Sequence, residues 1–496
     1  MNLTHDNPDC LWINPDLFDD GDGTFEHPYC AIETGLERVQ PGQAVVLQAG
    51  NYGADCNIQV SGTAHRPVRI VAMPGAEVVV RSACWFLYDT SDLILSGISF
   101  VDAPFGALSV IGSCSRNRFE DLMFVNCGGR RETACTLYIG GAGGGCNVVE
   151  NCSFLRPSGG AAAATDASIG LMIAQGDTAH GSPIVNCLVR RNRFENYAYG
   201  VVVGGDESRS ARCGHIVEYN ELSGCFREGI LVKSGDTRIR ANLVEKSTGG
   251  ALSLRSELDG SVEDNRIVEC GRGVFVHGTG HSVAGNCIVR CAGGALQVGG
   301  VSEDDHGTTE NCFIENNTFI DCSSPYRDGE STVAGILFDR GTTGIIQRNL
   351  IVGTGKPYAL VQSTVDGCER GASGETRFVI KDNYAAGGCL TQDGVGEMSV
   401  SFDNAQAGDY SNTSGVGAAG WVLKPQGFDP DCDTYGDQEA YREASVLEDD
   451  AGNLILPGGD DDCMGSLFGR FFNDAASDAP AVDDGDSAAL LRDDEE

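Results

Sequence analysis

An asparagine recurs through the middle of this chain in one context: Asn, any residue, an apolar residue, two further residues and, in several copies, Cys. Successive asparagines are 28, 22, 23, 21, 31 and 32 residues apart, and "DNYAAGG" around Asn383 suggests one more copy. A short period with occasional insertions is typical of a solenoid, in which each repeat packs only on its neighbours. The copies begin at Asn192, Asn220, Asn242, Asn265, Asn286, Asn317 and Asn349.

Each repeat also contains a second segment that begins with Gly. The segments are "GVVVGGD", "GILVKSG", "GALSLRS", "GVFVHGT", "GALQVGG" and "GILFDRG". Short β-branched and apolar runs between Gly turns indicate strands, because they are too short for helices. Two or three such strands in each repeat predict an all-β fold, a single-stranded right-handed parallel β-helix. In this fold like side chains of successive coils stack into ladders, about 4.8 Å apart.

The cysteines follow the same repeat. The chain has 21 Cys, an odd number, with no CxxC pair and no Cys/His spacing typical of zinc. A small thiol fills an inner position of a coil well. We therefore predict that Cys225, Cys270, Cys291 and Cys322 are core thiols rather than metal ligands or disulfides.

The two ends of the chain differ from the repeats. Ile32, Leu36 and Val39 have helical spacing and precede a "PG" turn and the run "AVVLQAG", which predicts a short helix that caps the first coil. Beyond about residue 400 the pattern fades into acidic, irregular sequence. We expect an N-terminal extension at 1–26, the capped β-helix at 27–400, and a C-terminal cap with an acidic tail at 401–496.

Charge and hydropathy limit the partners. The net charge is −37, and only 5 of the 34 basic residues are Lys, a balance that resembles the surfaces of proteins from salt-loving organisms. Nucleic acid is disfavoured because there is no basic stripe to bind phosphates. No apolar run approaches the 18 or so residues of a membrane span. No basic start and apolar core are visible, so we expect a cytoplasmic protein unless a leader has been removed.

Basic side chains end three successive Gly-led strands. Lys233 closes "GILVKS", Arg255 closes "GGALSLRS", and His277 follows in "GVFVHG". Parallel stacking predicts that the three lie on one outer face, within one or two strand spacings. Like charges gain nothing from adjacency without an anion, so the row predicts a site for a carboxylate-bearing chain.

The same stretch resembles a known family of enzymes. "EGILVKS", "GGALSLRSE" and "GRGVFVHGTGHSVAGNCIV", between Glu228 and Val289, are similar to the chondroitinase B and alginate lyase family of polysaccharide lyases. The resemblance covers roughly residues 30–350 and implies a β-helix that cleaves an acidic, uronate-containing polysaccharide by β-elimination. It places Lys233 at the catalytic base and Arg255 at the catalytic acid or charge stabiliser.

The resemblance also implies a metal and further substrate contacts. Glu228 falls on a calcium-ligand position, so Ca²⁺ is the implied cofactor, and His281 falls on the Gly-x-Gly-His position. His277, His281 and Arg340 are the predicted substrate-binding residues. The chain departs from the motif at Phe226, where the family has a second acid, and at Ser256, where it has His.

Calcium needs six to eight oxygen ligands. Glu228 with Asn220 or Asp206 is a thin set, and Arg or His would otherwise neutralise the substrate. Two other functions remain open at this point. One is a uronate epimerase or a hydrolase on the same scaffold, and the other is a non-catalytic β-helix that binds glycans or serves in an assembly.

Overall fold

The computed structural model describes most of the chain up to residue 397. The described residues are 3–5, 7–128, 135–141, 143–157, 168–174, 183–205, 211–299, 309–325, 332–338, 342–353, 357–362, 377–389 and 395–397. The predicted C-terminal cap and tail at 401–496 and the predicted substrate residue Arg340 lie outside them.

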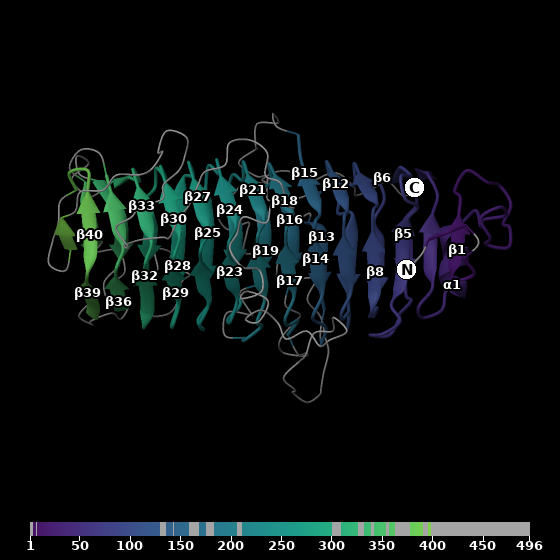
Figure 1. Ribbon diagram of the computed structural model, residues 1–496, viewed down its shortest axis with the longest axis horizontal. Helices are drawn as coiled ribbons and strands as arrows, with labels where there is room; N and C mark the ends of the chain where they lie inside the picture. Colours follow the sequence, from purple (N-terminus) through teal and green to yellow (C-terminus); the bar gives the residue numbers. More distant parts are fainter. Residues whose placement is uncertain are drawn as a thin grey trace, which may run out of the picture.

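The described chain forms three long sheets whose strands come from successive coils, so that a typical coil adds one strand to each sheet (Figure 1). Every strand pair is parallel except β34 with β35. The coils stack in sequence order along the long axis of the molecule, from the end with β1 to the end with β40 (Figure 1). The predicted all-β parallel β-helix is confirmed.

Sheet A has 14 strands. They are β1 (Cys10–Ile13), β2 (Ala44–Leu47), β5 (Val68–Ala72), β8 (Leu93–Ser96), β11 (Arg118–Glu120), β14 (Val148–Glu150), β17 (Leu188–Arg190), β20 (Ile216–Glu218), β23 (Arg238–Arg240), β26 (Ser261–Glu263), β29 (Ser282–Ala284), β32 (Cys312–Glu315), β36 (Thr343–Gln347) and β39 (Arg377–Lys381).

Sheet B also has 14 strands. They are β3 (Gly50–Asn51), β6 (Val78–Arg81), β9 (Ser99–Val101), β12 (Met123–Val125), β15 (Ser153–Leu155), β18 (Arg193–Glu195), β21 (Glu221–Ser223), β24 (Leu243–Glu245), β27 (Arg266–Val268), β30 (Cys287–Val289), β33 (Thr318–Ile320), β37 (Leu350–Val352), β40 (Asn383–Ala386) and β41 (Val395–Glu397).

Sheet C has 13 strands and contains the Gly-led segments. They are β4 (Cys56–Ile58), β7 (Trp85–Tyr88), β10 (Leu108–Ile111), β13 (Cys135–Gly140), β16 (Ile169–Ile173), β19 (Tyr199–Val203), β22 (Glu228–Val232), β25 (Gly250–Arg255), β28 (Arg272–His277), β31 (Leu296–Val298), β34 (Ser324–Pro325), β35 (Thr332–Phe338) and β38 (Tyr358–Gln362).

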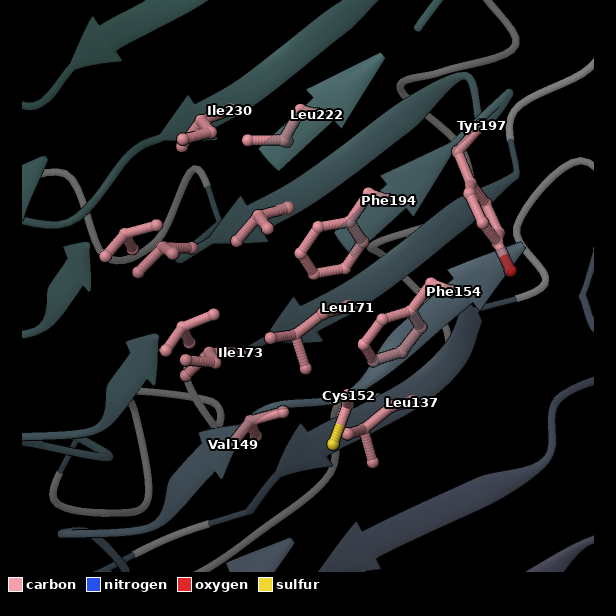
Figure 2. Close-up of a cluster of buried hydrophobic side chains, with 14 of the residues drawn as sticks. Leu137, Val149, Cys152, Phe154, Leu171, Ile173, Phe194, Tyr197, Leu222 and Ile230 are labelled. Carbon is pink, nitrogen blue, oxygen red and sulfur yellow. The ribbon is translucent and has the colours of Figure 1, made fainter. Parts of the chain in front are cut away.

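Inward side chains of the three sheets fill one continuous core. Phe100, Phe124, Phe154 and Phe194 stack on successive coils, with ring centroids 5.2, 4.6 and 4.5 Å apart, and Figure 2 shows the last two beside Leu171. Repeating the same residue type at one position of each coil makes such stacking automatic, because the strands align in register. The four predicted core cysteines are free and buried, which confirms that prediction.

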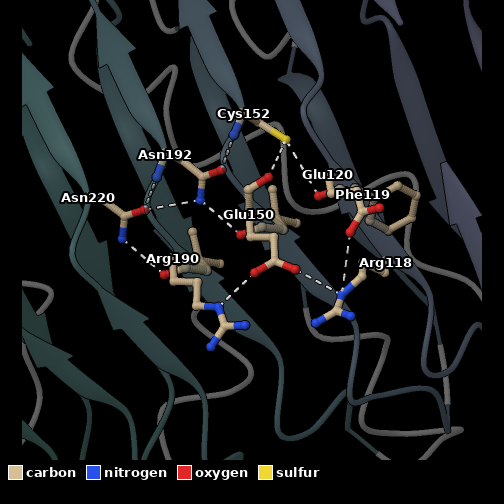
Figure 3. Close-up of polar contacts among 10 residues, drawn as sticks. Arg118, Phe119, Glu120, Glu150, Cys152, Arg190, Asn192 and Asn220 are labelled. Carbon is tan, nitrogen blue, oxygen red and sulfur yellow. Dashed lines mark hydrogen bonds and ion pairs between the residues drawn. The ribbon is translucent and has the colours of Figure 1, made fainter. Parts of the chain in front are cut away.

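The recurring asparagines form a buried ladder at the turn between sheets A and B. Asn242 illustrates the contacts: its backbone N–H and its Nδ2 both donate to Oδ1 of Asn265 on the next coil, each at 3.0 Å. The same Nδ2 also donates to the carbonyl of Val217 on the previous coil, at 2.8 Å. The pattern continues through Asn383, and Figure 3 shows the start of it at Asn192 and Asn220. The ladder satisfies turn groups that would otherwise be buried without partners.

The predicted capping helix is α1 (Ile32–Arg38), which buries Ile32 and Leu36. Strand β1 lies within the predicted N-terminal extension, yet it pairs with β2, so this part of the chain contributes a strand to the solenoid. Trp12 of β1 is buried. Among the described residues there is no helix with the length and apolar character of a membrane span.

Candidate active site

The three basic residues predicted to stack do lie in one row. Val232 pairs with Leu254, which places Lys233 beside Arg255, and Arg255 pairs directly with His277. Lys233 is half-buried, and its backbone N–H donates to the carbonyl of Val203 at 2.8 Å. The residues before them in each strand, Val232, Leu254 and Val276, belong to the core. Because side chains alternate across a strand, the row lies on the outer face of sheet C.

A second set of aligned residues on this face consists of a glutamate and an arginine with a glycine between them. Glu228, Gly250 and Arg272 occupy the same position of three successive coils. The Arg272 guanidinium donates to Glu228 Oε1 at 2.7 Å, although the two residues are two strands apart. A Cβ on Gly250 would lie 2.0 Å from Glu228 Oε2. The missing side chain at Gly250 therefore leaves room for the carboxylate to reach Arg272.

Arg255 approaches the same carboxylate from the row of basic residues. Its guanidinium lies 3.8 Å from Glu228 Oε1, the oxygen that Arg272 also contacts. Both guanidinium carbons lie 5.0 Å from the ring centroid of Phe275, and that ring is only 2% exposed. An aromatic face attracts cations within about 6 Å. Phe275 thus supports two guanidinium groups side by side, and one carboxylate neutralises only part of their charge.

Several polar atoms of this cluster have no hydrogen-bond partner in the described structure. They are Glu228 Oε2, Ser253 Oγ, Arg255 Nε and Arg272 Nε, four of the ten buried side-chain atoms of this kind. Ser253 lies beside Phe275 in the register and is fully buried. Buried polar atoms without partners are costly and are rare in folded proteins. The cluster therefore differs from a fully satisfied structural ion pair, because the described residues leave part of its hydrogen-bonding capacity unused.

Both histidines that the sequence predicted to bind substrate are buried. His277 ends β28 in register with Arg255 but is 3% exposed, and its Nδ1 lies 3.3 Å from the Thr309 hydroxyl. His281 is fully buried at the turn before β29, and its Nε2 lies 3.0 Å from the carbonyls of Ser256 and His277. Burial lowers the pKa of His281 and favours its neutral form. His281 therefore links the backbones of two coils rather than lining the outer face.

The two departures from the expected motif also have defined positions. Phe226 is half-buried at the turn before β22, and Ser256 is fully buried, with its hydroxyl donating to the carbonyl of Leu258. Asp206, one of the acids considered for a metal, lies outside the described residues. Arg272, Phe275 and Ser253 were missed by the sequence interpretation. The coil period that aligns Lys233 with Arg255 also aligns Glu228 with Arg272, so this signal was available.

The residues around Glu228 do not fit a calcium ion. The carboxylate already faces two guanidinium groups, which would repel a divalent cation. Asn220 uses its side chain in the ladder, where it donates to Val189 and accepts from Asn192. Within the described ranges there is no group of three or more His, Cys, Asp or Glu arranged to hold a metal. The six to eight oxygens that calcium needs are not assembled around Glu228.

Comparison with known proteins identifies the fold. The family model named right handed beta helix region matches residues 177–351, which confirms the predicted handedness. Pectate lyase PEL9 of Emericella nidulans is 32% identical over 72 residues, which are 14% of this chain and 18% of that protein.

Solved structures extend the likeness over most of the chain. The PL6 family alginate lyase AlyGC has a TM-score of 0.61 and 16% identity, with 83% of this chain and 56% of that chain covered. A mannuronic acid specific polysaccharide family 6 lyase from human gut microbiota has a TM-score of 0.54 and 21% identity, covering 74% and 88%. This protein shares the fold of family 6 polysaccharide lyases. It spans little more than half of AlyGC, and identities this low establish the fold alone.

Proposed function

We propose that the protein is a polysaccharide lyase that cleaves a uronate-containing polymer, alginate-like or glycosaminoglycan-like, by β-elimination. The observation that carries this proposal is the in-register row of Lys233 and Arg255 on the outer face of sheet C, beside Arg272. The row is a local positive site on a chain of net charge −37, which suits an anionic substrate. The shared fold with alginate lyases supports the same reaction class.

In this reaction Lys233 accepts the C5 proton of the uronate ring. The electron pair of that C–H bond becomes the C4=C5 double bond, the C4–O4 bond breaks, and the leaving oxygen takes up a proton. The C5 proton is weakly acidic, so neutralising the adjacent carboxylate is the larger demand on the site. Arg255 is placed to supply positive charge to that carboxylate or to the leaving oxygen.

Hydrolysis is less compatible with this face. Glycoside hydrolases use two carboxyl groups on either side of the scissile bond. On the three strands that form the described site, β22, β25 and β28, the one acidic side chain is Glu228, and it is paired with Arg272. Epimerisation begins with the same proton abstraction as elimination, so the product distinguishes those two reactions.

The test is to incubate the protein with alginate, dermatan and pectic polymers at low and high salt, and to record the ultraviolet absorbance of new unsaturated ends. We expect absorbance to rise with at least one uronate polymer and Lys233→Ala to abolish the rise. Lys246→Ala is a matched control, because Lys246 is exposed and lies on a different face beside Glu245. No unsaturated or epimerised product from any polymer would refute the proposal, and a fully active Lys233→Ala protein would refute the base assignment.

A further inference from the structure

We propose that arginine replaces calcium at this site: Arg272 and Arg255 together neutralise the substrate carboxylate, and Glu228 is a positioning residue rather than a metal ligand. The inference rests on the proposed function for the identity of the substrate. Its first observation is the direct ion pair between Arg272 and Glu228, at 2.7 Å. A guanidinium beside a carboxylate offsets its charge and repels a divalent cation, so this pair weakens any attraction for calcium.

The geometry of the pair assigns a role to Glu228. Its carboxylate occupies the space above Gly250 and holds Arg272 by one oxygen. Phe275 supports the two guanidinium groups from below, each 5.0 Å from the ring centroid. Arg272 is therefore fixed between an acid and an aromatic ring. A guanidinium that is held in place before binding loses little conformational entropy when the substrate arrives.

The charges and donors of the cluster match a carboxylate. Two arginines and one glutamate leave one net positive charge, which one uronate carboxylate would balance. The Arg255 and Arg272 side chains are each 27% exposed, so each guanidinium group is partly open to solvent. Arginine is well suited to this role, because its planar fork binds carboxylates through two parallel hydrogen bonds.

The first experiment tests calcium binding without using activity. Calcium is titrated into the full-length protein by calorimetry, and thermal unfolding is measured with calcium and with a chelator. We expect no saturable heat that depends on Glu228 and no shift of the unfolding temperature by either addition. Stoichiometric calcium binding that Glu228→Gln abolishes would overturn the proposal, whether or not the protein is a lyase.

The second experiment tests Arg272 as a substrate contact. The parent protein for this test is the Lys233→Ala variant, which lacks the proposed base. Uronate oligosaccharides are titrated into this parent and into three double variants, in which Arg272→Ala, Arg272→Lys or Arg190→Ala is added. Arg190 is a matched control, because it donates to Glu150 at 2.8 Å and is 28% exposed, against 27% for Arg272. We expect Arg272→Ala to weaken binding about tenfold or more, as for a lost charge-assisted hydrogen bond. Arg272→Lys should restore part of the affinity, and Arg190→Ala should leave it unchanged.

Circular dichroism of each variant separates loss of binding from loss of the fold. Equal binding by folded Arg272→Ala and its parent would overturn the role of Arg272. If the parent itself binds no uronate oligosaccharide and cleaves no polymer, the proposed function fails, while the calcium titration still decides whether Glu228 is a metal ligand.

Discussion

Two clusters on this molecule each place one glutamate between two arginines, but the carboxylate oxygens have different partners. On sheet A, one oxygen of Glu150 forms an ion pair with Arg118, at 2.9 Å, and the other accepts a hydrogen bond from Arg190, at 2.8 Å (Figure 3). In this first cluster Arg118 also lies 3.8 Å from a second acid, Glu120. On sheet C, Arg255 and Arg272 both face Oε1 of Glu228, while Oε2 has no hydrogen-bond partner in the described structure.

The difference separates a structural ion pair from a candidate site. In the sheet A cluster the partners lie on adjacent coils, so that in-register stacking brings them together. In the sheet C cluster Glu228 reaches across a glycine to the second coil, and donors and an acceptor remain buried without a partner among the described residues. Unmet hydrogen bonds at an outer face cost stability unless a ligand satisfies them. Composition alone therefore does not distinguish the two clusters.

The largest expected effect is on catalysis at sheet C. Arg255→Ala should lower turnover of a uronate polymer by roughly 10²- to 10³-fold, the usual effect of removing one charge-stabilising donor. Arg118→Ala, the counterpart on sheet A, should leave turnover unchanged. Initial rates from the absorbance of unsaturated ends measure both variants. Equal losses in the two would show that both clusters are structural.

The next effect concerns pH and the turn that leads into sheet A. His215 is buried there, its Nδ1 accepts from the Cys187 backbone N–H at 3.2 Å, and burial lowers its pKa to about 4. The unfolded chain binds this proton near pH 6.5, so stability from neutral His215 is complete above that pH and is lost as pH falls towards 4. The loss should be roughly 3 kcal/mol in the free energy of unfolding.

His215→Asn provides the control for this pH effect. Asn147 occupies the equivalent turn position two coils earlier, where its Oδ1 accepts from the Asn117 backbone N–H at 3.1 Å. An asparagine at 215 should therefore keep the acceptor without titrating. Denaturant unfolding between pH 7 and pH 4 should show a shallower decline for the variant. An identical decline would mean that other groups cause the acid sensitivity.

A smaller effect separates the two glutamates. Glu150→Gln should lower the free energy of unfolding by about 2 kcal/mol, because two arginines lose their charged partner. The loss is not larger because both arginines are partly exposed, and solvent screens their charge. Lyase activity should stay unchanged. Glu228→Gln should cost less stability, because within the described part of the chain only one of its oxygens is bonded, but should weaken substrate binding by loosening Arg272. Urea unfolding measures the stability of the two variants, and the Michaelis constant measures their substrate binding. Weaker substrate binding by Glu150→Gln than by Glu228→Gln would contradict the comparison.

The smallest effect tests the gap at Gly250. Gly250→Ala places a methyl group against Glu228 Oε2, so the carboxylate has to move away from Arg272. We expect a loss of about 1 kcal/mol in the free energy of unfolding and weaker substrate binding. In a double-mutant cycle with Glu228→Ala the penalty should largely vanish, because the clash is then absent. Additive effects of the two substitutions would show that the glycine acts through another contact.

The sequence predicted the fold and the alignment of Lys233, Arg255 and His277 for the same reason. An asparagine at one position of each coil sets the period, and the period places Lys233, Arg255 and His277 in one column. The buried cysteines and helix α1 followed from the same pattern. The substrate role assigned to His281 came from the motif alone. The structure buries that side chain at a turn position that His215 also occupies in an earlier coil.

The sequence by itself determined the repeat, the parallel stacking of the coils and which residue types share a column, because a solenoid converts spacing along the chain into position in space. The tertiary structure decided how the side chains in those columns pair. Arg272 could have pointed to solvent, but the space above Gly250 and the ring of Phe275 bring it to Glu228. The orientation of Arg272 depends on side-chain packing between coils two strands apart, and the spacing of residues along the chain does not specify that packing.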